Sequence, residues 1–418
     1  LWEYLDEHVY SHWDLELLDF LMKLTIVEEF DLELAKKITG NQNAERMIAK
    51  ALDHGTGIQR QVKEYSREQE LMKVDYEIRP PVRRSLFWKL RKTYGEEEIQ
   101  KLQQIYIVAC GSAYHVGVAA QYVIEELAQI PVRVELASEF RYREMPLVKD
   151  GLVIVISQSG ETADTLAAMR MAKDKGLATL AVVNVIGSSI AREADKVFYT
   201  LAGPEISVAT TKGYSAQLVA LDCIAVQFAK VKGLITDEQY SYYISELQTI
   251  PEKIEKVLQD KERIQWFAAK YANAHDVFFV GRGVDYAVCL EGSLKLKEIS
   301  YIHSEAYAAG ELKHGTISLI EDNILVIGVL TQSKLYEKTV SNMMECKSRG
   351  AYLMGVTNYG NYEMEDKVDF TVYVPKVDEH FMGSLAVIPL QLLGYYVSVA
   401  KGLDVDKPRN LAKSVTVE

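Results

Sequence analysis

Two patterns of hydrophobic and polar residues follow one another along this chain. Residues 1–103 place apolar side chains at helical spacing in "LLDFLMKLTIVEEF" and again in "NAERMIAKAL". "KVDYEIRPPVRRSLFWKLRKTYG" then combines a strand-like start, a break at Pro80–Pro81 and a basic helix closed by Gly95. These patterns predict a small, mostly helical segment over residues 1–103.

From about residue 104, short apolar runs replace the helical pattern. "IYIVACG" (105–111), "GLVIVISQSG" (151–160) and "ATLAVVNV" (178–185) are rich in β-branched residues, and each precedes a turn signal and a helical pattern. Strands that alternate with helices in this way predict a parallel sheet with helices on both faces.

The same pattern occurs a second time. "VFFVGRG" (277–283) matches "IYIVACG" at an offset of 172, while "ILVIGVLTQS" and "YLMGVTN" match the other two runs at 174. Matched strand ends in the same order indicate a duplicated domain, and a helical stretch over 213–272 joins the copies. We therefore predict an α/β fold with two tandem doubly wound, flavodoxin-like domains, 104–250 and 251–418.

Composition narrows the classes of function. The net charge of −12 argues against a sequence-independent nucleic-acid binder. The four cysteines fit neither a zinc site nor a disulfide framework, so we expect a reduced, cytoplasmic chain. We see neither a signal peptide nor the roughly 18 uncharged apolar residues of a membrane span. The sequence begins at Leu1 rather than Met, so we expect a fragment or a processed product.

Ligands of open parallel sheets lie just after the strands, so the strand-end loops are the candidate sites. "ISQSGETADTL" (156–166) places the hydroxyls of Ser157, Ser159 and Thr162 beside Gln158, at the start of a predicted helix. Hydroxyls and the free N–H groups of a helix N-terminus together suit a phosphate dianion. One hydroxyl is enough for an ordinary helix cap, so capping stays an alternative.

Two other strand-end loops offer small or hydroxyl residues. "CGSAYHVG" (110–117) contains Ser112 and "EISVATTKG" (205–213) contains Thr210, although ordinary turns use the same residues. Cys110 is a candidate nucleophile, with a small buried hydrophobe as the commoner role.

A second candidate site lies on the helix predicted over "CLEGSLKLKEISYI" (289–302). Glu291, Lys295 and Glu298 are spaced to share one face. A solvated Glu–Lys pair, worth about 0.3–0.5 kcal/mol, is the alternative. Together with His314, these groups suit proton transfer at a sugar carbonyl, with a base, a cation beside the enediolate and an acid–base group for ring opening.

Several motifs together resemble the sugar-isomerising half of the glutamine–fructose-6-phosphate aminotransferase (glucosamine-6-phosphate synthase) family. They are "CGSAYH", "ELASEFRYR", "SQSGETADTL", "GRGVDYAVCLEGSLKLKEISYIHSEAYAAGELKHG" and "KPRNLAKSVTVE", and the likeness covers about residues 104–418. It implies two sugar-isomerase domains that convert fructose 6-phosphate and ammonia to glucosamine 6-phosphate without a metal or organic cofactor.

The resemblance also implies roles for particular residues. Glu298 would move a proton between C1 and C2, with Lys295 and Glu291 supporting the enediol-like intermediate. His314 would open the sugar ring from the neighbouring subunit of a homodimer, and Lys413 would contact the sugar as a Schiff base. The implied substrate-binding residues are Cys110, Gly111, Ser112, Ser157, Gln158, Ser159, Thr162, Val208 and Thr210.

The chain departs from that family at its beginning. The family carries an N-terminal glutaminase, which these residues lack, so we expect free ammonia or an external glutaminase. Residues 1–103 instead resemble the winged-helix-like segment of LuxR-type, maltose-regulator-like activators. Their basic helix, Arg83–Lys92, is either a phosphate-contacting face or a solvated one.

Other functions fit the same sequence. A non-catalytic sugar-phosphate sensor would relay occupancy to the N-terminal segment, but it would not need Glu298, His314 and Lys413. A deaminase running the reverse reaction, or an isomerase exchanging glucose 6-phosphate and fructose 6-phosphate, would use the same fold.

Overall fold

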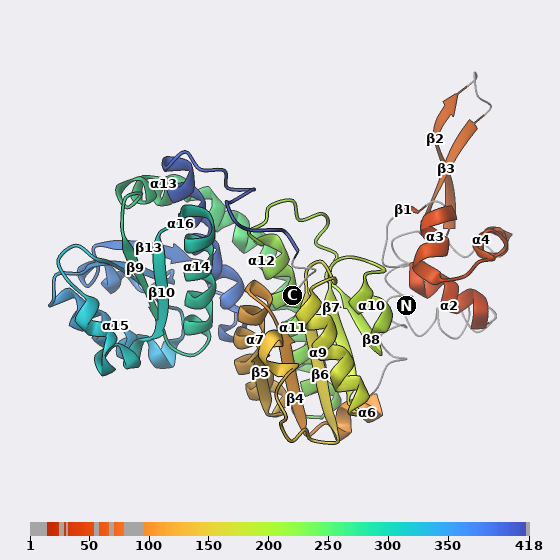
Figure 1. Cartoon of the computed structure of the whole chain (residues 1–418), viewed down its shortest axis with the longest axis horizontal. Helices are drawn as coiled ribbons and strands as arrows, with labels where there is room; N and C mark the ends of the chain where they lie inside the picture. Colours follow the sequence, from red (N-terminus) through yellow and green to blue (C-terminus); the bar gives the residue numbers. More distant parts are fainter. Residues whose placement is uncertain are drawn as a thin grey trace. The chain divides into compact units, whose positions relative to one another are not determined.

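The chain forms two compact units, Leu1–Glu98 and Ile99–Glu418, shown along the chain in Figure 1. The computed structural model describes residues 15–24, 29–30, 32–53, 58–66, 71–78 and 96–414.

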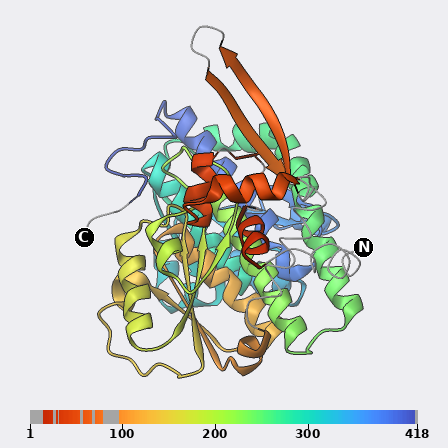
Figure 2. The ribbon, with the colours of Figure 1, turned by 90° about the vertical axis from the view of Figure 1, so that its right-hand side faces the viewer.

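Over its described residues, the first unit combines three helices with a three-stranded antiparallel sheet in the order β1-β3-β2. Its elements are α2 (Leu15–Leu24), β1 (Glu29–Phe30), α3 (Leu32–Thr39), α4 (Ala44–Asp53), β2 (Ile58–Ser66) and β3 (Leu71–Ile78). Figure 2 shows the β2–β3 hairpin projecting from the helices. Buried apolar residues of the helices, among them Leu17, Phe20 and Ile48, form a separate small core.

The helices and the strand-like start predicted in this unit are present as α2, α4 and β3. Two features differ from the prediction. The helical pattern of "LLDFLMKLTIVEEF" ends at Leu24, and Glu29–Phe30 pairs with β3 instead. Strand β2 was not predicted, because "IQRQVKEYS" is too polar to show a buried strand face. The basic helix expected over Arg83–Lys92 lies outside the described residues.

The second unit contains two parallel five-stranded sheets with the same strand order. The first copy runs through β4 (Gln104–Ala109), α7 (Ser112–Ala128), β5 (Val132–Leu136), α8 (Ala137–Phe140), β6 (Gly151–Ser157), α9 (Ala163–Asp174), β7 (Ala178–Val183), α10 (Ser189–Glu193), β8 (Lys196–Tyr199) and α11 (Lys212–Val231), after the short α6 (Glu96–Lys101). Its sheet order is β5-β4-β6-β7-β8.

The second copy repeats this order as β10-β9-β11-β12-β13. Its main elements are β9 (Asp276–Gly281), α14 (Val284–Ser300), β10 (His303–Ala308), β11 (Leu325–Leu330), α15 (Tyr336–Lys347), β12 (Tyr352–Asn358), β13 (Phe370–Val374) and α16 (Gly383–Ala400). Short 3-10 turns η2 (Ala309–His314), η3 (Thr316–Leu319), η4 (Ser333–Leu335), η5 (Tyr362–Asp366) and η6 (Glu379–Phe381) join them, and α12 (Asp237–Gln259) and α13 (Lys261–Lys270) connect the copies. The predicted fold of two tandem α/β domains is confirmed.

The duplication extends to backbone angles. Gly111 before α7 has φ 58° and ψ −132°, and Gly283 before α14 has φ 60° and ψ −131°. Both helices also end in the left-handed region, at Gln129 and Tyr301. Residues with a Cβ rarely adopt the backbone conformation of these two glycines. Each copy therefore needs glycine between its first strand and its first helix.

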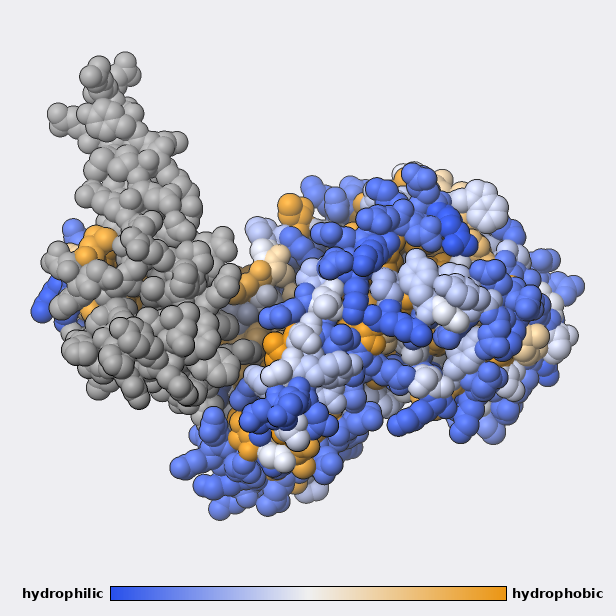
Figure 3. All heavy atoms as spheres, turned by 180° about the vertical axis from the view of Figure 1, so that it is seen from behind, coloured by the Kyte–Doolittle hydropathy of each residue, from blue (hydrophilic) through white to orange (hydrophobic). Residues whose placement is uncertain are grey.

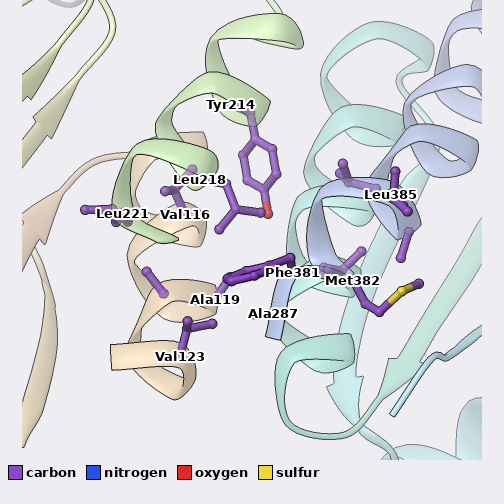
Figure 4. Packing of buried hydrophobic residues seen from close by; sticks show 14 of the residues in the cluster. Val116, Ala119, Val123, Tyr214, Leu218, Leu221, Ala287, Phe381, Met382 and Leu385 are labelled. Atoms are coloured by element: carbon purple, nitrogen blue, oxygen red, sulfur yellow. The ribbon is translucent and has the colours of Figure 1, made fainter. Parts of the chain in front are cut away.

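The two copies share one hydrophobic core. Figure 4 shows α7 and α11 of the first copy packed against α14 and α16 of the second, with Phe381 between them. Because this contact is apolar and continuous, residues from the two copies can hold fixed positions relative to each other.

One described segment, Glu379–Ala400, is long and apolar enough to cross a membrane, although the sequence analysis expected none. It packs against α13 and α14, and 72% of its apolar window is buried in the protein. Its apolar residues are therefore explained as part of the core. The face in Figure 3 is largely hydrophilic over the described residues, with small separate apolar areas.

Candidate active site

The loop between β6 and α9 forms a compact cluster of hydroxyls. Ser157 Oγ lies 2.9 Å from Thr162 Oγ1 and accepts a hydrogen bond from the Gly160 N–H at 3.0 Å. Thr162 occupies the N-cap position, but its side chain caps no backbone N–H of the helix. Capping therefore does not account for the Thr162 hydroxyl, and the anion-binding alternative from the sequence remains. We call this loop, Ser157–Thr162, the hydroxyl cradle.

Glycine is required inside the hydroxyl cradle. Gly160 has φ +66°, and a Cβ there would lie 2.0 Å from the Ser188 hydroxyl. The tight turn keeps the backbone N–H groups at the strand end close together, as an anion site requires.

Cys110 does not have the environment of a nucleophile. Its Sγ lies 3.8 Å from Thr165 Oγ1, and burial raises the pKa of its thiol. A reactive cysteine needs a lowered pKa. The structure therefore favours a partly buried packing role for Cys110, with Gly111 and Ser112 following it at the start of α7.

The C-terminal tail lies along the 205–213 loop of the first copy. The Val208 N–H donates to the Asp406 carbonyl at 2.9 Å, and Ser414 Oγ lies 3.0 Å from Ser159 Oγ. Lys413 Nζ donates to the Ser207 carbonyl at 2.5 Å. The tail therefore brings Ser414 to the hydroxyl cradle and Lys413 to the 205–213 loop, positions that its polar composition did not indicate.

Three charged residues of α14, Glu291, Lys295 and Glu298, form a chain of contacts through Lys295. Lys295 Nζ lies 3.4 Å from Glu291 Oε1 and pairs with Glu298 Oε2. The side chains of Glu291 and Lys295 are 0% and 2% exposed, whereas that of Glu298 is 20% exposed. A solvated surface pair is thereby excluded, and only Glu298 is open to a ligand.

The carboxylates keep Lys295 protonated. Burial lowers the pKa of Lys295, but the adjacent Glu291 and Glu298 outweigh burial and hold this pKa above its usual value. A buried ammonium next to a partly exposed carboxylate is suited to stabilising negative charge that develops on a substrate oxygen.

The pKa of Lys413 is shifted in the opposite direction, below its usual value. Burial lowers its pKa, and the cations Lys295 and Lys212 lower it further, against the carboxylates Glu205 and Glu298. A lysine with a lowered pKa has a larger neutral fraction and is a better nucleophile toward a carbonyl carbon. Lys295 and Glu298 of α14 are therefore among the charges that act on the pKa of Lys413.

His115, which was not among the predicted site residues, joins the two copies. His115 on α7 places its Nδ1 2.9 Å from Glu291 Oε2 on α14. A chain of contacts therefore runs from His115 through Glu291 and Lys295 to Glu298. The only signal in the sequence was its position in "CGSAYHVG", because its partner lies 176 residues away.

We predict that His115→Ala lowers the free energy of unfolding by about 1–3 kcal/mol, because a fully buried carboxylate loses a hydrogen-bond partner. Urea denaturation followed by circular dichroism measures this change. His303→Ala is the matched control, since His303 is 61% exposed and pairs with Asp276 at 2.7 Å. Its loss should cost less than about 1 kcal/mol. Equal losses would contradict the role assigned to burial.

His314 is not brought to the other candidate residues. It is exposed at the end of η2, and its side chain has no hydrogen bond or ion pair to any described residue. Among residues 15–24, 29–30, 32–53, 58–66, 71–78 and 96–414, no group of three His, Cys, Asp or Glu residues is placed to hold a metal ion.

Two known domain families match the chain. The SIS domain matches residues 98–227 and again 270–401, and the MalT winged helix domain matches residues 5–93. The first match covers both copies of the α/β fold, and the second agrees with the likeness of residues 1–103 to maltose-regulator-like activators.

Individual proteins are similar to the second unit. A glutamine–fructose-6-phosphate aminotransferase (isomerizing) of Caldanaerobacter subterraneus subsp. tengcongensis is 56% identical over 324 residues, 77% of this chain and 53% of that protein. A solved C-terminal domain of glucosamine-fructose-6-phosphate aminotransferase from Francisella tularensis is 40% identical, with a TM-score of 0.73, and the match covers 75% of this chain and 89% of that one.

A glucosamine-6-phosphate deaminase from Thermotoga maritima is 25% identical, with a TM-score of 0.62 over 79% of this chain and 96% of that one. The chain spans about half the length of the curated relatives it matches.

Proposed function

Because the chain belongs to the SIS domain family, with two copies of that domain in tandem, we propose that it is a sugar-phosphate isomerase and aminotransferase module. It converts fructose 6-phosphate and ammonia to glucosamine 6-phosphate and water. The names of its relatives support this reaction. We assign the first domain to residues 104–250 and the second to 251–418.

One observation carries the proposal: the tail links the hydroxyl cradle to the α14 charges. Ser414 lies 3.0 Å from Ser159 in the cradle, while the charges of Lys295 and Glu298 influence the pKa of the neighbouring Lys413. A ligand with a phosphate group at the cradle and a carbonyl group beside Lys413 and the α14 charges would therefore occupy one site. A sugar phosphate has both groups.

The phosphate binds in the hydroxyl cradle, with Ser112 and the Val208–Thr210 loop beside it. Lys413 Nζ attacks carbonyl carbon C2 of the open sugar, and water leaves to give an imine. Ammonia then displaces the lysine, which leaves a C2 imine that carries the transferred nitrogen.

Glu298 next takes a proton from C1 and returns a proton to C2, while the O1 hydroxyl proton passes to the imine nitrogen. The products are an aldehyde at C1 and an amine at C2. The Lys295 ammonium stabilises the enediol-like intermediate, and Glu291 holds that ammonium in place. His314 of a second subunit opens the sugar ring, so the working form is a homodimer. Ammonia is free or comes from a glutaminase, and the module works in the cytoplasm.

The direct test incubates the protein with fructose 6-phosphate and ammonium and measures glucosamine 6-phosphate by mass spectrometry. We expect product with ammonium and none with glutamine alone. Absence of product with either nitrogen source contradicts the proposal. Tight binding of fructose 6-phosphate without turnover would instead favour a sugar-phosphate sensor.

A further inference from the structure

The second copy contains a counterpart of the hydroxyl cradle that is already occupied. Thr331–Ser333 corresponds to Ser157–Ser159 at the offset of 174. The Asp285 carboxylate accepts hydrogen bonds from the Thr331 N–H at 2.8 Å, the Thr331 hydroxyl at 2.5 Å and the Gln332 N–H at 3.3 Å. Glu379 accepts from the Ser333 N–H at 3.3 Å. Two carboxylates of the chain itself therefore fill this loop.

Asp285 is built into the protein interior. It is 2% exposed, and burial raises its pKa to about 6, against the hydrogen bonds from Thr331 and Gln332. Two backbone N–H groups and one hydroxyl donate to this carboxyl, an arrangement that favours its ionised form. The second copy demonstrates that a strand-end loop of this fold holds a buried anion by its N–H groups and a hydroxyl.

The first copy lacks both carboxylates at its cradle. Ala113 is the counterpart of Asp285, and each is the second residue of its helix, α7 or α14. Glu205 is the counterpart of Glu379, but it accepts instead from the Gly213 N–H at 2.7 Å. Within the part of the chain that the structure describes, no carboxylate accepts from the N–H groups of Ser157–Ser159.

We propose that the residue at this helix position decides which copy takes a phosphate group: Ala113 leaves the first cradle open, and Asp285 closes the second. Each chain then binds one phosphate group, although it carries two copies of the domain. The inference rests on the proposed function, since it assumes that the first cradle receives the phosphate of the sugar.

Moving the carboxylate tests the proposal. Ala113→Asp should place an acid in the first cradle and weaken binding of inorganic phosphate at least about 100-fold, while an acidic residue in the first helical turn is favourable for folding. Ala113→Asn is the matched comparison with the same shape and no charge; it fills the same space without repelling the anion, so it should weaken binding clearly less than Ala113→Asp does. Equilibrium dialysis with radiolabelled phosphate measures affinity and stoichiometry, and circular dichroism verifies the fold.

The reverse change opens the second cradle. Asp285→Ala should raise the stoichiometry from one phosphate per chain to two, and Asp285→Ser provides a second variant if the first does not fold. A folded Asp285 variant that still binds one phosphate would contradict the closing role of this residue. If phosphate still binds after Ala113→Asp, the proposed role of this helix position is wrong, but the proposed sugar-phosphate site stands. If the unaltered chain binds no phosphate, the proposed sugar-phosphate site is wrong as well.

Discussion

Replacing Glu298 by Gln is expected to lower kcat by about 10²- to 10⁴-fold, the usual contribution of a general acid–base group. Gln has nearly the same shape but cannot take a proton from C1. Lys295 keeps its partner Glu291 at 3.4 Å, so the buried charges should remain in place. The dissociation constant for fructose 6-phosphate should therefore change less than about threefold, as calorimetric titration would measure.

Loss of binding, rather than of turnover, would mean that Glu298 anchors the site instead of acting as its base. A mixed dimer is the control for misfolding. Since His314 is proposed to act across the subunit interface, Glu298→Gln and His314→Ala chains mixed under exchange should regain activity that neither has alone. No recovery would argue against a shared site.

Replacing Lys413 by Arg is expected to remove a covalent adduct. Fructose 6-phosphate with cyanoborohydride should reduce a Lys413 imine to a stable secondary amine, which intact-protein mass spectrometry and peptide mapping detect. Because burial lowers the pKa of Lys413, the neutral amine forms at a lower pH than for an ordinary lysine. Arginine keeps the positive charge but forms no imine, so we expect the adduct to fall more than about tenfold and kcat at least about 100-fold.

Lys407→Arg is the matched control, since Lys407 lies in the same tail but is exposed. It should leave both adduct and activity intact. An adduct that persists in Lys413→Arg would place the imine on another lysine, and an active Lys413→Arg protein would exclude an essential imine.

The fold could be predicted because its signals are local. The β-branched runs at 105–111 and 277–283 each end in a glycine, and those glycines have nearly identical backbone angles in the structure. The shared face of Glu291, Lys295 and Glu298 also follows from helical spacing alone, and the three side chains form a chain of contacts through Lys295.

The rest of the site depends on contacts between distant segments. His115 meets Glu291 across 176 residues, and Ser159 meets Ser414 across 255. No spacing rule links such pairs, because they meet only once two domains and the tail have packed together. Burial distinguishes between the alternatives at two other positions. The Lys295–Glu291 pair lies in the interior rather than at the surface, and burial raises the pKa of the Cys110 thiol, which makes it a poor nucleophile.

The position of Lys413 has a consequence for synthesis of the protein. About 300 residues separate Ser112 from Lys413, and a ribosome adding about 5–20 residues per second needs roughly 15–60 s to cover that distance. The first domain can fold long before the tail that lies on its cradle has been made. Catalytic competence should therefore appear only after both domains have emerged, so a nascent chain would hold a formed phosphate pocket before it could perform chemistry.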